Sequence, residues 1–165
     1  MKKLTAFLSM MLVFVASLAA QTSQSFSLKS LLKQEDSDGY RCWLLKHKDD
    51  LAKSLEQDGF VYKKAGVEKE FFGCDDCEDE SNIDAEWKLY QKGDINVYSY
   101  YYISGGGYLD AVEIVFADKE AARNFIDTAI KDGLHLNEYN SGYYNLDSLT
   151  IYYKNPTTIH IEAIP

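Results

Sequence analysis

The stretch Trp87–Tyr102, WKLYQKGDINVYSYYY, alternates in side-chain type on both sides of a Gly-Asp pair. In an extended strand successive side chains point to opposite faces, so Ile95 and Val97 share one face and the neighbouring tyrosines share the other. Those tyrosines are Tyr98, Tyr100 and Tyr102. We therefore predict an antiparallel hairpin with one apolar face and one tyrosine-rich face. The function of the tyrosine-rich face has to be explained.

Two segments have the apolar spacing of amphipathic helices. In DKEAARNFIDTAIKDG, residues 118–133, apolar side chains recur at three- and four-residue steps and form one stripe. Asp118 is a suitable N-cap, and Gly133 is a suitable stop. The earlier stretch LLKHKDDLAKSLEQDG, residues 44–59, has a similar stripe and also ends in Asp-Gly. We predict one helix in each segment.

The shared Asp-Gly ending indicates an internal repeat. Each ending is followed by a strand candidate and later by a hairpin, at residues 87–102 in the first half and 149–164 in the second. We predict two corresponding units, residues 44–103 and 118–165. The alternative is that an α+β protein contains such runs in this order without any duplication.

These elements predict an α+β fold, with an antiparallel sheet, two amphipathic helices on one face and the other face open. Tandem units of one helix and three or four strands would place Val97 and Ile159 at matching positions, and the strand 108–116 would lead into the second helix. The predicted helix-facing residues are Trp87, Leu89, Ile95, Val97, Val112, Ile114, Phe116, Leu149, Ile151, Ile159 and Ile161. The layout is similar to that of the secreted β-lactamase inhibitor proteins, tandem helix-plus-sheet units that bind a protein through the sheet. This similarity is one of architecture without a shared motif.

The N-terminus MKKLTAFLSMMLVFVASLAAQ has two lysines, an apolar run and then small residues. This order is typical of a secretory signal peptide, residues 1–20, cleaved after Ala19 or Ala20. The alternative, a transmembrane anchor, needs about 20 apolar residues. No cysteine follows the cleavage site, so we expect no lipid anchor and a secreted or periplasmic protein. We interpret residues 21–39 as a polar, mobile leader and residues 40–165 as a single α+β domain.

The net charge is −9, and it becomes −11 once Lys2 and Lys3 are removed with the signal peptide. This acidic balance argues against nucleic acids as partners. Nucleic acid affinity depends on lysine and arginine releasing counterions from phosphates, so we expect no DNA or RNA partner. The same charge disfavours anionic membrane surfaces, and we expect no membrane contact after cleavage. We expect no cofactor.

The open face should collect the side chains that bind a partner. Tyrosine combines a large ring with a hydroxyl at modest entropic cost, which suits recognition surfaces. The predicted binding residues are Tyr90, Tyr98, Tyr100, Tyr102, Tyr152, His160, Lys92 and Lys154. We expect a small binding or inhibitory protein that recognises a protein or a glycan. The alternative use of these rings is cross-strand pairing that stabilises the sheet without a ligand.

Two functions of other classes remain open. A secreted hydrolase could use Glu113, Glu162 and His160 on the same face, but acid–base groups need burial or paired charges to tune them. A structural envelope protein could instead pack its tyrosines against another copy as a homodimer. We favour a protein that is not an enzyme.

The three cysteines cannot all pair within one chain. In an exported protein a disulfide between Cys74 and Cys77, in the acidic loop CDDCEDESNID, is the first interpretation. Cys42 would then stay free, in the core beside Trp43. A zinc site using His47 with the cysteines lacks the spacing of known fingers, and the acids lack the pattern of an EF-hand, so we expect no metal.

Overall fold

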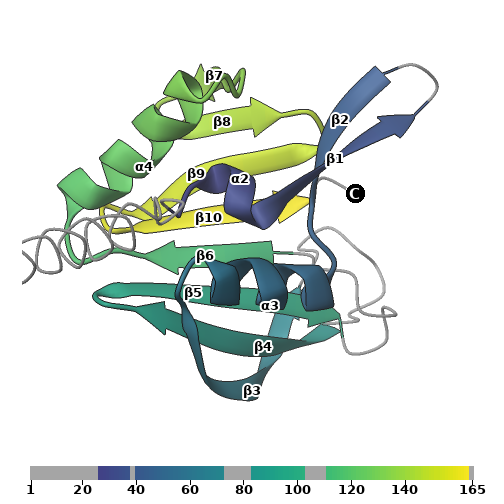
Figure 1. Ribbon diagram of the computed structural model, residues 1–165, viewed down its shortest axis with the longest axis vertical. Helices are drawn as coiled ribbons and strands as arrows, with labels where there is room; N and C mark the ends of the chain where they lie inside the picture. The colour runs from purple at the N-terminus through teal and green to yellow at the C-terminus, as the bar shows by residue number, and fades with distance from the viewer. Residues whose placement is uncertain (1–25, 38–39, 73–82, 103–110, 164–165) are drawn as a thin grey trace, which may run out of the picture.

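The structure, a computed structural model, describes residues 26–37, 40–72, 83–102 and 111–163. Within these ranges the fold is α+β, with an eight-stranded antiparallel sheet and a two-stranded hairpin, which confirms the predicted class (Figure 1). No helix in them is long and apolar enough to cross a membrane.

The helices are α2 Leu28–Leu31, α3 Lys48–Gln57 and α4 Lys119–Lys131. The hairpin strands are β1 Leu32–Ser37 and β2 Tyr40–Leu45. The strands of the large sheet, in spatial order, are β3 Val61–Phe72, β4 Ile83–Lys92, β5 Ile95–Tyr102, β6 Ala111–Val115, β10 Thr158–Ala163, β9 Leu149–Asn155, β8 Tyr143–Leu146 and β7 Asn137–Asn140.

The large sheet has a symmetrical strand order about its centre. Each half begins with a helix, continues as four antiparallel strands, and ends in the central strand β6 or β10. In this order β5 corresponds to β9, and β6 corresponds to β10. Val97 lies in the third strand of its half and Ile159 in the fourth, so the predicted match between them does not agree with the strand order.

Both long helices pack on one face of the sheet (Figure 1). The N-cap of α4 is Asp118, whose side chain accepts a hydrogen bond from the Ala121 amide at 2.8 Å, as the sequence predicts. Gly133 follows α4 with a φ of 83°, a conformation that glycine adopts without strain. The fully buried core residues include Leu51, Leu55, Val97, Ile114, Leu149, Ile151, Ile159 and Ile161.

The faces of β4 are the reverse of those predicted. The turn between β4 and β5 contains only Gly93 and Asp94, so Lys92 pairs directly with Ile95. Residues opposite each other in an antiparallel pair share a face, so Lys92 and every second residue before it lie on the helix side. Tyr90 is buried in the main core, and Trp87 and Leu89 lie on the open face.

The ammonium of Lys92 confirms this placement. Its Nζ donates to the Asp58 carbonyl at the end of α3, at 2.5 Å, and lies over the ring of Phe60. Lys92 therefore binds the end of a helix in its own fold. Neither Tyr90 nor Lys92 belongs to the open face.

The segment from residue 26 is part of the domain, which differs from the predicted mobile leader. The Phe26 ring packs against Phe60 and Phe125, with centroids 4.7 and 5.3 Å apart, and Leu28 and Leu31 are fully buried. One phenylalanine and three leucines among polar residues therefore suffice to anchor this segment between the two long helices.

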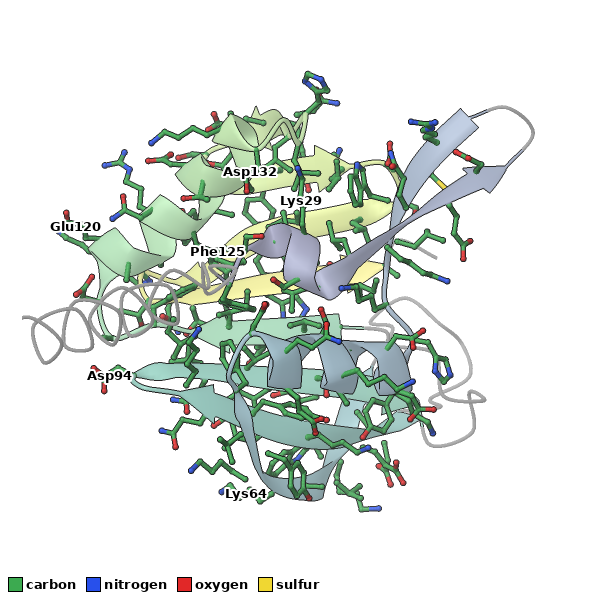
Figure 2. The ribbon with its side chains drawn as sticks, in the orientation of Figure 1. Lys29, Lys64, Asp94, Glu120, Phe125 and Asp132 are labelled. Carbon is green, nitrogen blue, oxygen red and sulfur yellow. The ribbon has the colours of Figure 1, made fainter. Side chains whose placement is uncertain are left out.

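Two lysines fix α2 to both helices. Lys46 Nζ donates to the Ser30 carbonyl and the Ser54 hydroxyl of α3, each at 2.7 Å. Lys29 Nζ donates to the Asp132 carbonyl at the end of α4, at 2.6 Å, and Figure 2 labels both residues. The carbonyls at a helix end lack partners within the helix, and a lysine can satisfy them. The bonds to the Ser30 and Asp132 carbonyls therefore take the place of bonds to water.

Cys42 lies in β2 and is half-buried, outside the main core, which differs from its predicted position. Its Sγ is 3.7 Å from the Glu35 carbonyl of the neighbouring strand. Cys74 and Cys77 lie outside the described residues, so their disulfide stays a prediction. Within the part of the chain that the structure describes, no three His, Cys, Asp or Glu side chains are grouped as metal ligands.

Two isoleucines one turn apart on α4 give a matched test of this packing. Ile126 is 2% exposed in the core, and Ile130 is 49% exposed. We expect Ile126→Ala to lower the free energy of unfolding by about 2–5 kcal/mol through lost burial and a cavity. Ile130→Ala should cost about 1 kcal/mol or less. Urea unfolding measures both, and equal losses would contradict the orientation of α4.

Candidate recognition surface

Aromatic side chains form the first half of a row across the open face. The rings of Trp87 and Tyr98 meet edge to face at 5.9 Å, and those of Tyr98 and Tyr100 stack at 6.4 Å. Lys64 Nζ lies over the Trp87 ring at 5.6 Å. These contacts join β3, β4 and β5 through side chains on one face.

The second half of the sheet continues the row. Tyr143 stacks on Tyr152 at 5.1 Å, and Tyr152 packs on His160 at 4.9 Å. Tyr139 extends the row at the far edge, where its ring lies 6.0 Å from Tyr143. We name the whole set the aromatic row: Lys64, Trp87, Tyr98, Tyr100, Glu113, His160, Tyr152, Tyr143 and Tyr139.

A polar centre joins the two halves of the aromatic row. Glu113 of β6 and His160 of β10 are paired residues, with Oε1 and Nδ1 3.1 Å apart. Lys154 Nζ donates to the same oxygen at 2.5 Å, and the Tyr100 hydroxyl donates to Glu113 Oε2 at 3.5 Å. His160 Nε2 is 3.2 Å from a carboxylate oxygen of Glu162. Both ring nitrogens of the histidine therefore face carboxylates.

Glu113 and His160 in this centre are almost fully shielded from solvent, at 7% and 5% exposed. Burial raises the pKa of Glu113, but hydrogen bonds from His160 and Lys154 outweigh it, and the pKa is lowered. Burial lowers the pKa of His160, but its bonds to Glu113 and Glu162 outweigh it, and the pKa is raised. The arrangement thus favours a carboxylate next to a protonated imidazole.

Two tyrosines of the row, Tyr100 and Tyr152, have raised pKa values. Burial, followed by the charges of Glu162, Tyr143 and Glu113, raises the pKa of Tyr152 to about 12. Burial, then the charge of Glu113, also raises the pKa of Tyr100. Both hydroxyls are therefore neutral near neutral pH, and that of Tyr100 already donates to Glu113.

Small residues and one bulge position these rings. A Cβ at Gly66 of β3 would lie 2.6 Å from the Trp87 ring, so the indole needs glycine beneath it. Tyr100 is buried with Ala85 and Ala111, whose small side chains leave room for its ring. The β7–β8 register shifts between Glu138 and Asn140, and the extra residue, Tyr139, reaches the row.

Most predicted binding residues come together here. The open face holds Tyr98, Tyr100, Tyr152, His160 and Lys154. Tyr102 belongs to β5, but its side chain lies outside the described part. The prediction missed Trp87, Tyr139, Tyr143 and Lys64. The two-residue turn between β4 and β5 could have indicated that Trp87 lies on the open face. No sequence pattern indicates the bulge that brings Tyr139 to the row.

The acid–base residues of the hydrolase alternative also meet in this centre. Glu113 lies on β6 and His160 and Glu162 lie on β10, and His160 is within hydrogen-bond range of both carboxylates. Their geometry has a structural explanation, because each charge offsets its neighbour inside a shielded cluster.

Comparison with known proteins gives no relative. No protein-family model matches the chain, and no curated protein or solved structure is significantly similar to it. The function must therefore be argued from the aromatic row itself.

The polar centre predicts a pH dependence of stability. A raised folded pKa means that His160 stabilises the fold fully below its unfolded value of 6.5, and that this contribution is lost as the pH rises through the folded value. We expect the free energy of unfolding to fall as the pH rises above 6.5. His160→Gln should remove this decline, whatever its own effect on stability.

The matched control is His135→Gln, because His135 is exposed. Urea unfolding at a series of pH values measures the slope. The wild-type decline should persist in the His135 variant. A decline that survives in His160→Gln would contradict the assignment.

Proposed function

We propose that this chain is an exported protein that recognises another protein through its open sheet face. The observation that carries the proposal is the aromatic row, which runs from Lys64 on β3 to the exposed Tyr139 on β7. Tyrosine and tryptophan are enriched in the energetically important parts of protein interfaces.

The size of the row favours a protein partner over a glycan. Eight strands give seven spacings of about 4.8 Å, or roughly 34 Å across the face. This width suits a standard protein interface of about 800 Å² per partner. A short glycan would cover only a part of it.

The row also has the anatomy of an interface. Its rings form two apolar groups, and Lys154 and Glu162, which are partly exposed, place opposite charges at the polar centre between them. The neutral tyrosine hydroxyls supply hydrogen bonds without a charge to desolvate. The similar layout of the β-lactamase inhibitor proteins supports protein recognition by analogy alone.

Export is part of the proposal. It is supported by the signal-like residues 1–20. The partner would then be met in the periplasm or outside the cell. A hydrolase is less well supported, because Glu113 and His160 are buried and both ring nitrogens of His160 already face carboxylates, which leaves neither nitrogen for a substrate.

Site-specific crosslinking tests this surface. A photoreactive phenylalanine analogue at Tyr143, which is exposed in the row, should crosslink one protein from the extracellular fraction of the natural source. The same analogue at exposed Ile130, on the helix side, is the matched control. Crosslinks of equal yield at both positions would contradict recognition through the row.

Affinity for the crosslinked partner then tests the energetics. We expect Tyr143→Ala and Tyr152→Ala each to weaken binding by about 30-fold, or 2 kcal/mol, as interface hot spots do. Ile130→Ala should leave the affinity unchanged. Calorimetric titration of purified proteins measures this, with thermal melts as a check of folding. Unchanged affinity in both tyrosine variants would refute the proposal.

A further inference from the structure

The outer edge of β3 is long and exposed. β3 spans Val61–Phe72 at one end of the eight-stranded sheet, and within the described residues only β4 pairs with it. Every residue from Val61 to Lys69 is exposed apart from half-buried Gly66. Figure 2 shows Lys64 on this outer strand. A free edge of this length can accept another strand through its backbone groups.

The nearest charges on the two sides of Gly66 have opposite signs, and Lys69 lies beyond them. Lys63 and Lys64 precede it, and Glu68 follows it, with small or apolar Ala65 and Val67 between. An antiparallel copy of the same strand reverses this order. A second copy centred on Gly66 would therefore place Lys64 opposite Glu68 twice, once on each side of the axis.

We propose that β3 pairs with β3 of a second copy of this chain, antiparallel and with Gly66 at the two-fold axis. The register from Lys64 to Glu68 is regular against β4, so this segment is suitably extended. Val67 of each copy would cover Ala65 of the other on the helix side. Glycine at the axis leaves the Trp87 ring in place on the open face.

This register keeps the two copies in the same orientation. Residues opposite each other share a face, and Lys64 and Glu68 already share the open face of one sheet because they are four positions apart in a regular segment. The two sheets would join into one with both open faces on the same side. The two aromatic rows would then meet end to end at Lys64, giving a bivalent surface.

The remaining charges limit the paired segment. Lys63 occupies the register shift between Tyr62 and Lys64, so regular pairing ends there. In the proposed register it would approach Lys69 of the other copy, whose charge is already compensated by an ion pair with Asp84. The edge lysines also hinder pairing with unrelated strands, which leaves the self-complementary register favoured.

A charge swap tests the proposal with the purified protein. Sedimentation velocity at concentrations up to about 100 µM should show a reversible dimer. Lys64→Glu should raise its dissociation constant about tenfold or more, because two glutamates would then face each other on each side of the axis. The double variant Lys64→Glu/Glu68→Lys should restore dimerisation to within about threefold of wild type, since the swap recreates both pairs.

Two controls separate this dimer from other assemblies. Lys131→Glu makes the same charge change on α4 and should leave dimerisation unchanged, as should Tyr143→Ala in the aromatic row. A wild-type protein that stays monomeric over this range would overturn the proposal. So would a Lys64→Glu variant that dimerises normally, a double variant that stays monomeric, or a dimer lost in Tyr143→Ala. Recognition by the aromatic row would be unaffected by these failures, because a monomer carries the complete row.

Discussion

The pairing of β6 with β10 is the constraint on which the rest of the structure depends. These strands join the two halves of the sheet, and the register places Ile114 opposite Ile159 and Glu113 opposite His160. The first pair lies on the helix side, so the halves share one apolar core. The second pair lies on the open side, where it joins the two groups of rings. A slip of one residue would exchange these faces and bury charges in the core.

The chemistry of the open face follows from that central pair. A buried carboxylate is costly unless it is fully hydrogen-bonded, and Glu113 meets this need with Lys154, His160 and the Tyr100 hydroxyl. These partners come from three strands besides its own. The polar centre therefore fixes the positions of neighbouring rings, and a recognition surface with fixed side chains loses less entropy when it binds.

Sequence patterns predicted the parts of this structure that local rules govern. The apolar stripe and the Asp118 cap identified α4, and alternation placed Val97 inside and Tyr98 outside. Alternation failed on β4, because Trp87 and Leu89 are more apolar than the Lys88 and Tyr90 side chains that face the helices. There the two-residue turn decides the face. The packing of α2 and the bulge at β7 depend on distant contacts, such as Phe26 with Phe125, that no local pattern contains.

β10, the last strand that the structure describes, occupies the middle of the sheet, and this order governs how the chain can fold. Until β10 pairs, one edge of β6 has no hydrogen-bonding partner and the aromatic row is divided. The apolar sides of the two halves then cannot form their shared core. The first half must therefore wait, incompletely folded, for residues more than 40 positions further along the chain. Chains in which β10 has not yet paired consequently expose an edge of β6, which is a site for aggregation.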